Sequence, residues 1–187
     1  MREAKVTPTG VERTFDEDRL IVTKTDRKGI ITYANAMFLE VSALTEREVL
    51  GQPHNVIRHP EMPRCVFQLL WERISHQKEI FAYVVNLAAD GAHYWVLAHV
   101  TPSLDPAGSI VGYHSSRRLP QRKAVQEVQA VYAKLRAEEA RHSRPADAVA
   151  ASADLLRATL AERGQTYDQF VWALTEIAPV DEVVTRR

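Results

Sequence analysis

The chain has little of what disulfide-bonded, membrane-spanning or nucleic-acid-binding proteins require. Its 187 residues contain one cysteine, so no disulfide can form within the chain and a reducing compartment is expected. Lysine plus arginine and aspartate plus glutamate number 24 each, and this balance favours neither nucleic acid nor an anionic membrane as a partner. Uncharged runs are too short to cross a bilayer, and the first residues lack the apolar core of a signal peptide. We expect a cytoplasmic protein without membrane insertion.

Common catalytic motifs are also missing from the sequence. We find no glycine-rich phosphate loop, no nucleophile elbow, and no HExxH or cysteine/histidine metal spacing. His54 and His59 lie five residues apart, but that spacing specifies no coordination geometry on an irregular loop. Cys65 has no CxxC partner and is expected to be a buried, neutral thiol. The sequence therefore predicts a protein that is not an enzyme and has no metal centre.

What the sequence does contain is an unusual segment at residues 51–63, GQPHNVIRHPEMP. Its three prolines each remove a backbone donor and restrict the preceding residue, so neither a regular helix nor a strand is expected. Two histidines, an arginine and a glutamate accompany the apolar pair Val56 and Ile57. Because loops held by a rigid scaffold often carry binding residues, this segment is the first candidate for a ligand site.

Strand signals lie on both sides of this loop and are separated by turns such as Asp90-Gly91. Five segments have this character: 20–26, 30–33, 80–87, 93–100 and 110–116. Alternation along the fourth segment places Val96, Ala98 and Val100 on an inward face and His99 on the outward face. The turns predict an antiparallel arrangement, with a hairpin first and three consecutive strands later.

Helical periodicity fills most of the remaining chain. The segments are 36–50, in which Thr45 and Glu48 form a capping box for a short second helix, and then 64–77, 121–141, 146–161 and 167–177. The order of elements along the chain, two strands, then short helices, then three strands, predicts an α+β fold with helices on one face of the sheet. The apolar stripes of the last helices are too sparse for a separate core, so docking on the sheet or on another subunit is expected.

Three regions are predicted from this organisation. Residues 1–17 form an N-terminal arm that is flexible or packs in a dimer, residues 18–120 form the central α+β domain, and residues 121–187 form a helical C-terminal extension for signal transmission or dimerisation.

Four groups of residues occur in the same order as in the PAS domains of aerotaxis receptors, and residues 18–120 resemble that family. They are Asp26 to Asn35 (DxxGxITYAN), the loop 51–63, Asp90 to Trp95 (DGxHYW) and Gly112-Tyr113. The loop motif from Asn55 to Pro63 is the most specific of the four. The resemblance implies a PAS fold, in which a five-stranded antiparallel sheet and short helices on one face enclose a pocket. In the best-known relatives this pocket binds FAD and reports redox state.

The loop residues match the family well. Asn55, Arg58 and His59 stand where the family has them, and Glu61 replaces an aspartate. The fork of donors on Arg58 suits a pyrophosphate or ribose, and His59 suits the adenosine half of a flavin dinucleotide. The alternative is that Arg58 bonds to carbonyl groups and only holds the loop together.

The strand residues match less closely. By analogy with flavin-binding light sensors, Asn86 is expected to bond the edge of the isoalloxazine ring and His114 to contact the ring, and Trp71 joins the candidate cofactor-binding residues. The basic residues that the family carries after the shared asparagine are missing here, and Ile80 replaces a tryptophan, which counts against FAD. Cys65 does not stand at the light sensors' cysteine position, so a photoreceptor is not expected.

The resemblance implies a cytoplasmic PAS sensor that binds FAD and reports redox or oxygen state to a signalling protein such as a chemoreceptor or kinase, most simply as a homodimer. The connection Arg117 to Pro120 joins the last strand directly to the next helix, so a displaced strand can transmit a signal. Three alternatives stay open: a ligand-free module for protein–protein interaction, a sensor with haem bound through His59 or His114, and a pocket for a small metabolite or fatty acid.

Overall fold

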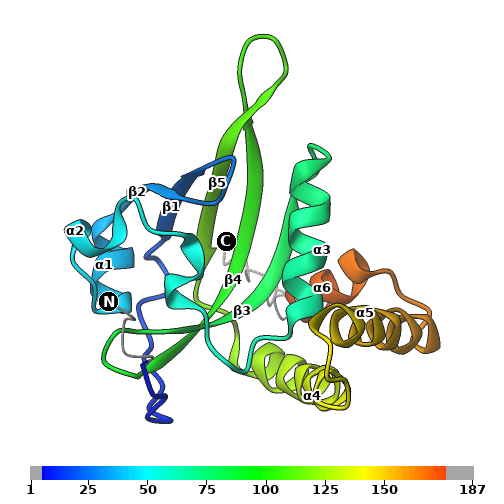
Figure 1. Cartoon of the computed structure of the whole chain (residues 1–187). Coiled ribbons are helices and arrows are strands. Elements are labelled where there is room, and N and C mark those ends of the chain that lie inside the picture. Colours follow the sequence, from blue (N-terminus) through cyan, green and yellow to red (C-terminus); the bar gives the residue numbers. More distant parts are fainter. Residues whose placement is uncertain (1–5, 176–187) are drawn as a thin grey trace, which may run out of the picture.

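Residues 6–175 are described in the computed structural model, and their strands form one five-stranded antiparallel sheet (Figure 1). The strands are β1 (Ile21–Asp26), β2 (Ile31–Ala34), β3 (Ile80–Leu87), β4 (His93–Leu104) and β5 (Ile110–Arg118). Their order across the sheet is β2-β1-β5-β4-β3, so the first and last strands in the sequence pair at its centre. The predicted α+β class and the five antiparallel strands are confirmed.

The helices begin and end close to the predicted positions. They are α1 (Ala36–Ser42), α2 (Glu46–Val49), the 3₁₀ turn η1 (His54–Ile57), α3 (Arg64–Ser75), α4 (Arg122–Glu139), α5 (Pro145–Glu162) and α6 (Tyr167–Thr175). Ala43 takes a left-handed conformation at φ 53° and separates α1 from α2, whose predicted capping box is present at Thr45 and Glu48. The last two residues of the predicted helix 167–177 lie outside the described residues. In the part of the chain described, no helix is long and apolar enough to cross a membrane.

The helices cover both faces of the sheet (Figure 1). Helix α3 lies against β3 and β4, and α5 packs beside it. Helix α4 crosses the opposite face, where the Tyr132 hydroxyl donates to the Tyr83 carbonyl at 2.7 Å and the rings of Tyr132 and Trp95 lie 6.3 Å apart. Trp172 of α6 packs on Phe81 of β3, with ring centroids 4.8 Å apart. Helices α4 and α6 therefore dock on their own sheet, which is one of the two arrangements expected, and α5 packs on α3 and α4.

The N-terminal arm is held against the turn between β3 and β4. The backbone N–H of Thr9 donates to the Gly91 carbonyl at 2.9 Å, and that of Arg13 donates to the His93 carbonyl at 2.7 Å. The Arg13 guanidinium also pairs with Asp90. Gly91 has φ +88°, and an added Cβ would lie 2.6 Å from the Thr7 carbonyl oxygen, so only glycine fits here. The described part of the arm thus extends the domain and is not a free segment.

Candidate ligand-binding site

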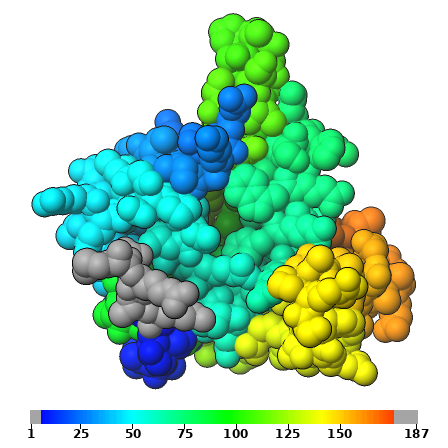
Figure 2. All heavy atoms as spheres, viewed as in Figure 1, coloured from blue at the N-terminus to red at the C-terminus, as the bar shows by residue number. Residues whose placement is uncertain are grey.

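A cavity of about 280 Å³ lies between the inner face of the sheet and helix α3. Figure 2 shows its opening as a hollow between the atoms of the first helices and loop and those of α3. The lining comes from β1, β3, β4, β5 and α3, from Lys28 and Gly29 in the first hairpin turn, and from the loop 53–58. Ala98 and Val100 line the cavity and His99 faces outward beside Glu79, at 2.7 Å, as the alternation of β4 predicts. The sheet therefore supplies the floor of a concave site.

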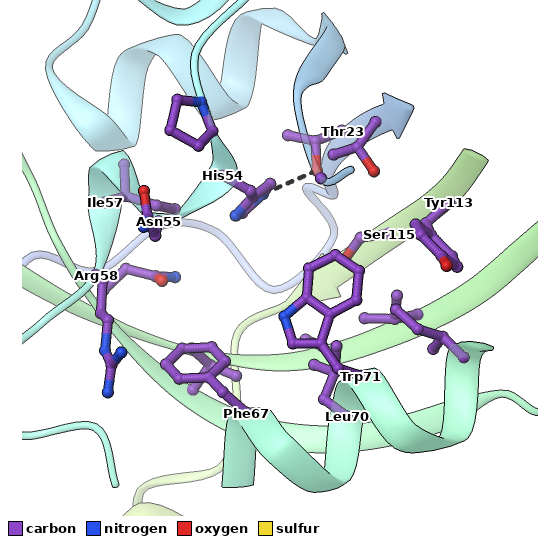
Figure 3. Close-up of a pocket in the computed structure, with 18 of the residues that line it drawn as sticks. Thr23, His54, Asn55, Ile57, Arg58, Phe67, Leu70, Trp71, Tyr113 and Ser115 are labelled. Carbon is purple, nitrogen blue, oxygen red and sulfur yellow. Dashed lines mark hydrogen bonds between the residues drawn. The ribbon is translucent and has the colours of Figure 1, made fainter. Parts of the chain in front are cut away.

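The buried polar part of the lining, here called the closed end, consists of Arg117 and Ser115 of β5 and Asn86 of β3 together with Thr23 and His54, which bond Arg117. The Nη2 of Arg117 donates to Thr23 Oγ1 at 3.0 Å and to His54 Nε2 at 2.7 Å. Because a guanidinium has donors only, His54 Nε2 is an acceptor and its proton lies on Nδ1. Burial, with the Arg117 charge as a further cause, lowers the pKa of His54 to about 3. Burial lowers the pKa of Arg117 to about 10, so the guanidinium is still charged at neutral pH. A neutral histidine thus positions a buried cation. Figure 3 shows His54 pointing into the cavity beside Thr23.

Several donors around this end of the cavity are buried without a hydrogen-bond partner. They are Nη1 of Arg117, Nδ2 of Asn86 and Oγ of Ser115, and all three residues line the cavity. Within residues 6–175, Arg117 forms no ion pair with a carboxylate. An unpaired buried donor costs about 1 to 3 kcal/mol, and more if it is charged. The cavity is therefore complementary to a ligand whose inner edge carries hydrogen-bond acceptors and negative charge.

The loop 51–63 closes one side of the cavity through backbone contacts to the first hairpin turn and to strand β3. The His54 N–H donates to the Gly29 carbonyl at 2.9 Å, and Arg58 forms an isolated antiparallel bridge with Asn86 of β3. Ile57 is buried and anchors the turn η1 in the core. These contacts explain why the loop is ordered despite its prolines, and they place Asn55 and Arg58 at the rim of the cavity.

Aromatic and basic side chains surround the opening. Trp71 of α3 is 41% exposed and meets the Tyr113 ring edge to face at 5.5 Å. The Arg58 guanidinium lies 4.9 Å from the centre of the Phe67 ring, and its Nη2 has a long contact of 3.4 Å to the Met62 carbonyl. Figure 3 shows Arg58, Phe67 and Trp71 around the same space. The Arg58 side chain is exposed, so a weak loop contact leaves its donors accessible to a ligand.

Four of the seven candidate residues predicted from the sequence line the cavity: Asn55, Arg58, Trp71 and Asn86. His59 and Glu61 do not. The His59 ring is buried against His93 at 5.8 Å, and its Nδ1 accepts the Glu61 N–H at 3.1 Å. The Glu61 carboxylate pairs with Arg136 of α4 at 3.5 Å. These two loop residues connect the loop to the rest of the protein and do not face the cavity.

His114, the seventh candidate, does not line the cavity. Tyr113, Ser115 and Arg117 line the cavity, and strand alternation turns His114 to the other face, between Lys24 of β1 and Thr101 of β4. Sequence reasoning missed Arg117, although counting alternate residues from Tyr113 would have identified it. Thr23 and His54, which bond Arg117, are 94 and 63 positions away from it in the sequence and gave no local signal.

The sheet order and the short helices around the cavity are those of a sensor fold, and comparison with protein families identifies this fold. The family model described as the PAS fold matches residues 21–115, and the chain belongs to the PAS family.

Curated relatives support this assignment. The Aerotaxis receptor of Escherichia coli (strain K12) is 36% identical over 121 residues, which cover 65% of this chain and 24% of the receptor. The Nitrogen fixation regulatory protein of Klebsiella pneumoniae is 26% identical over 103 residues, which cover 55% of this chain and 21% of that protein. The chain thus spans about a quarter or less of the length of these relatives.

Solved structures show the same fold. The light-state structure of the blue-light photoreceptor Aureochrome1 LOV aligns with a TM-score of 0.54 at 21% identity, covering 57% of this chain and 85% of that one. A light-oxygen-voltage domain studied with a flavin analogue aligns with a TM-score of 0.54 at 19% identity, covering 66% of this chain and 90% of that one.

Proposed function

We propose that the chain is a PAS sensor that binds a flavin, FAD, in the cavity and reports redox or oxygen state to a signalling partner. The observation that carries the proposal is the group of buried donors at the closed end, which includes the unpaired Nη1 of the charged Arg117. The pyrimidine edge of an isoalloxazine ring presents carbonyl oxygens and ring nitrogens to such donors. A bound flavin would supply reversible electron transfer, and the charge of Arg117 would stabilise negative charge on a reduced ring held in the cavity.

The size and charge of the site support a dinucleotide. A volume of about 280 Å³ is at the lower end for small-molecule pockets, so it suits one ring system with the rest of the ligand at the opening. Lys28 and Arg58 both line that opening and carry positive charge suited to phosphates. Lys28 supplies a cation in place of the basic residues that the family carries after Asn86.

The alternatives fit less well. His54 is the one histidine in the lining, and its Nε2 is already the acceptor for Arg117, so haem would have to displace a buried cation. Cys65, the single cysteine, is buried outside the lining, which does not support a photochemical bond to a flavin. A permanently empty cavity would leave Arg117 buried without a counter-charge. A ligand-free interaction module is therefore the less favoured reading.

The rest of the proposal concerns the partner and the setting. We propose that the sensor is cytoplasmic, acts as a homodimer and has no catalytic activity of its own. The similarity to an aerotaxis receptor and to a nitrogen fixation regulatory protein supports a partner such as a chemoreceptor or kinase. The direct connection from β5, which carries Arg117, to α4 supports output through the C-terminal helices.

Equilibrium titration of the ligand-free protein with FAD, FMN and riboflavin, followed by flavin fluorescence, tests the proposal. If the donors hold the ring and the cations at the opening hold phosphates, both nucleotides bind more tightly than riboflavin, and high salt reduces this difference. Arg58→Gln should lower the affinity for FAD and FMN but not for riboflavin. The matched control Arg47→Gln alters an exposed residue of α2 outside the lining. Binding of none of the three flavins contradicts the function.

A further inference from the structure

The first turn of helix α3 is capped by a residue far away in the sequence. Pro63 occupies the N-cap position, and no side chain there bonds to the helix. The backbone N–H groups of Arg64 and Cys65 instead donate to one oxygen, Oε1 of Glu139, at 2.7 and 3.2 Å. Free N–H groups at a helix start need such an acceptor, and a carboxylate is favoured there by the helix dipole. Glu139 is the last residue of α4, so a C-terminal helix completes a helix of the cavity wall.

The same carboxylate oxygen also joins a third helix. Ser152 of α5 is fully buried, and its Oγ donates to Glu139 Oε1 at 3.0 Å. One turn earlier on α4, Arg136 pairs with Glu61 of the loop at 3.5 Å. In Figure 1 the end of α4 and the first half of α5 lie near the start of α3. The end of α4 therefore contacts both the loop that borders the cavity and the helix that follows this loop.

The other end of these contacts reaches the cavity. Arg58 lines it, lies over the ring of Phe67 of α3, and contacts the carbonyl of Met62, the residue before Pro63. Phe67 and Trp71 line the cavity one and two turns after the capped start of α3. A ligand that moves Arg58 or the wall of α3 therefore moves the amide groups that Glu139 binds.

From this geometry we propose that Glu139 is a positioning residue that couples the cavity to the C-terminal helices. When the loop and α3 hold the position seen here, one oxygen accepts three hydrogen bonds and fixes α4 and α5 to α3. A displacement of about 1 Å lengthens these contacts beyond bonding distance and releases α5. The proposal rests on the proposed function only in taking a flavin as the ligand that moves the wall. The coupling itself can be tested with or without a ligand.

Hydrogen exchange of α5, followed by mass spectrometry with and without saturating FAD, tests the coupling. In the wild type, FAD is expected to change the exchange of residues 145–162 by about fivefold, the factor that corresponds to one helix cap. In Glu139→Ala this FAD-dependent change is expected to disappear while FAD still binds. Glu139→Gln keeps an acceptor oxygen and should retain part of the change. The control Glu138→Gln alters the neighbouring carboxylate, which pairs with Arg141 and His142 near the end of α4, and should behave as the wild type.

A purely structural cap predicts something different. Glu139→Ala would then unfold at a lower temperature but would keep the full FAD-dependent change in α5, and this result would overturn the proposal. A wild type that binds FAD without any change in α5 would also overturn it.

A protein that binds no flavin would refute the proposed function but would leave the coupling open to a direct test. Phe67→Ala removes a side chain from the cavity wall and so perturbs α3 without any ligand. It should increase the hydrogen exchange of α5 when Glu139 is present but not when it is combined with Glu139→Ala. Additive effects of the two substitutions would overturn the coupling. If Glu139→Ala does not fold, as judged by circular dichroism and cooperative unfolding, Glu139→Gln replaces it in both experiments, with a reduced coupling as the expected result.

Discussion

Replacing Arg117 with methionine is expected to stabilise the ligand-free protein and to weaken flavin binding. Burial lowers the pKa of Arg117 from 12.5 to about 10, which corresponds to about 3 kcal/mol against the charged form in the folded state. Below pH 10 this cost is fully present, and it is relieved only as the pH rises above that value. Methionine removes the charge but also the bonds to Thr23 and His54, each worth about 1 kcal/mol. A net gain of about 1 kcal/mol remains, or about 2 to 4 °C in Tm.

The effect on the ligand has the opposite sign. Loss of a charge-assisted hydrogen bond from Arg117 costs about 1.5 to 3 kcal/mol, so the Kd for oxidised FAD should rise by roughly 10- to 150-fold. The reduced ring carries more negative charge, so the same substitution should cost reduced FAD more binding free energy than oxidised FAD. A further loss of about 1.4 kcal/mol would lower the two-electron midpoint potential by about 30 mV.

Thermal unfolding of the ligand-free protein, a flavin titration and a redox titration measure these effects. Arg118→Met is the matched control, because Arg118 is the next residue on β5, is exposed and does not line the cavity. It should leave the Kd and the midpoint potential unchanged. If Arg117→Met binds FAD as tightly as the wild type and has the same midpoint potential, Arg117 does not contact the ring and the reasoning is refuted.

Two further predictions concern the residues around Arg117 and the opening. The pKa of His54 is about 3 in the folded state and about 6.5 when unfolded, so the unfolded chain takes up a proton first as the pH falls. The free energy of unfolding should therefore decrease by up to about 1.4 kcal/mol per pH unit below pH 6.5. NMR should show that the His54 ring is neutral at pH 5, and a His54 ring that titrates near pH 6.5 would contradict this prediction. Gly29 has a φ of +79°, and in Gly29→Ala the added Cβ would also lie 2.9 Å from Cη2 of Trp71. Gly108→Ala is the control, because Gly108 has a similar φ of +81° but its added Cβ would contact no other atom within 4 Å. Both should lose about 1 to 2 kcal/mol of stability, but only Gly29→Ala should change the Kd for FAD, and equal Kd values would show that Trp71 does not border the ligand.

The fold was predictable where the signals are local. Asn35 caps α1 by accepting the Phe38 N–H at 3.0 Å, and the Thr45 box starts α2, so short-range side-chain patterns define these ends. The N-terminal arm was not predictable, because its pairing of Glu12 with His93 joins residues distant in the sequence. Long-range contacts of this kind leave no periodic pattern in the chain.

The site was predictable only in part, and for a related reason. The loop motif located Asn55 and Arg58, but it did not show that the 3₁₀ turn directs His54 inward and leaves His59 against His93. The residue chosen by analogy, His114, stands one position away from the lining residues Tyr113 and Ser115, and a shift of one residue in a strand reverses the face. Alternation along β5 places Arg117 correctly, and its importance follows from its unpaired burial, which only the assembled structure shows.

The absorption spectrum of the protein as purified, recorded before and after dithionite, tests most directly whether the cavity holds a flavin. The account predicts the near-ultraviolet and blue bands of oxidised flavin, their loss on reduction, release of FAD on denaturation, and lower occupancy in Arg117→Met than in Arg118→Met. A Soret band, or a protein that stays colourless after incubation with FAD, would contradict it.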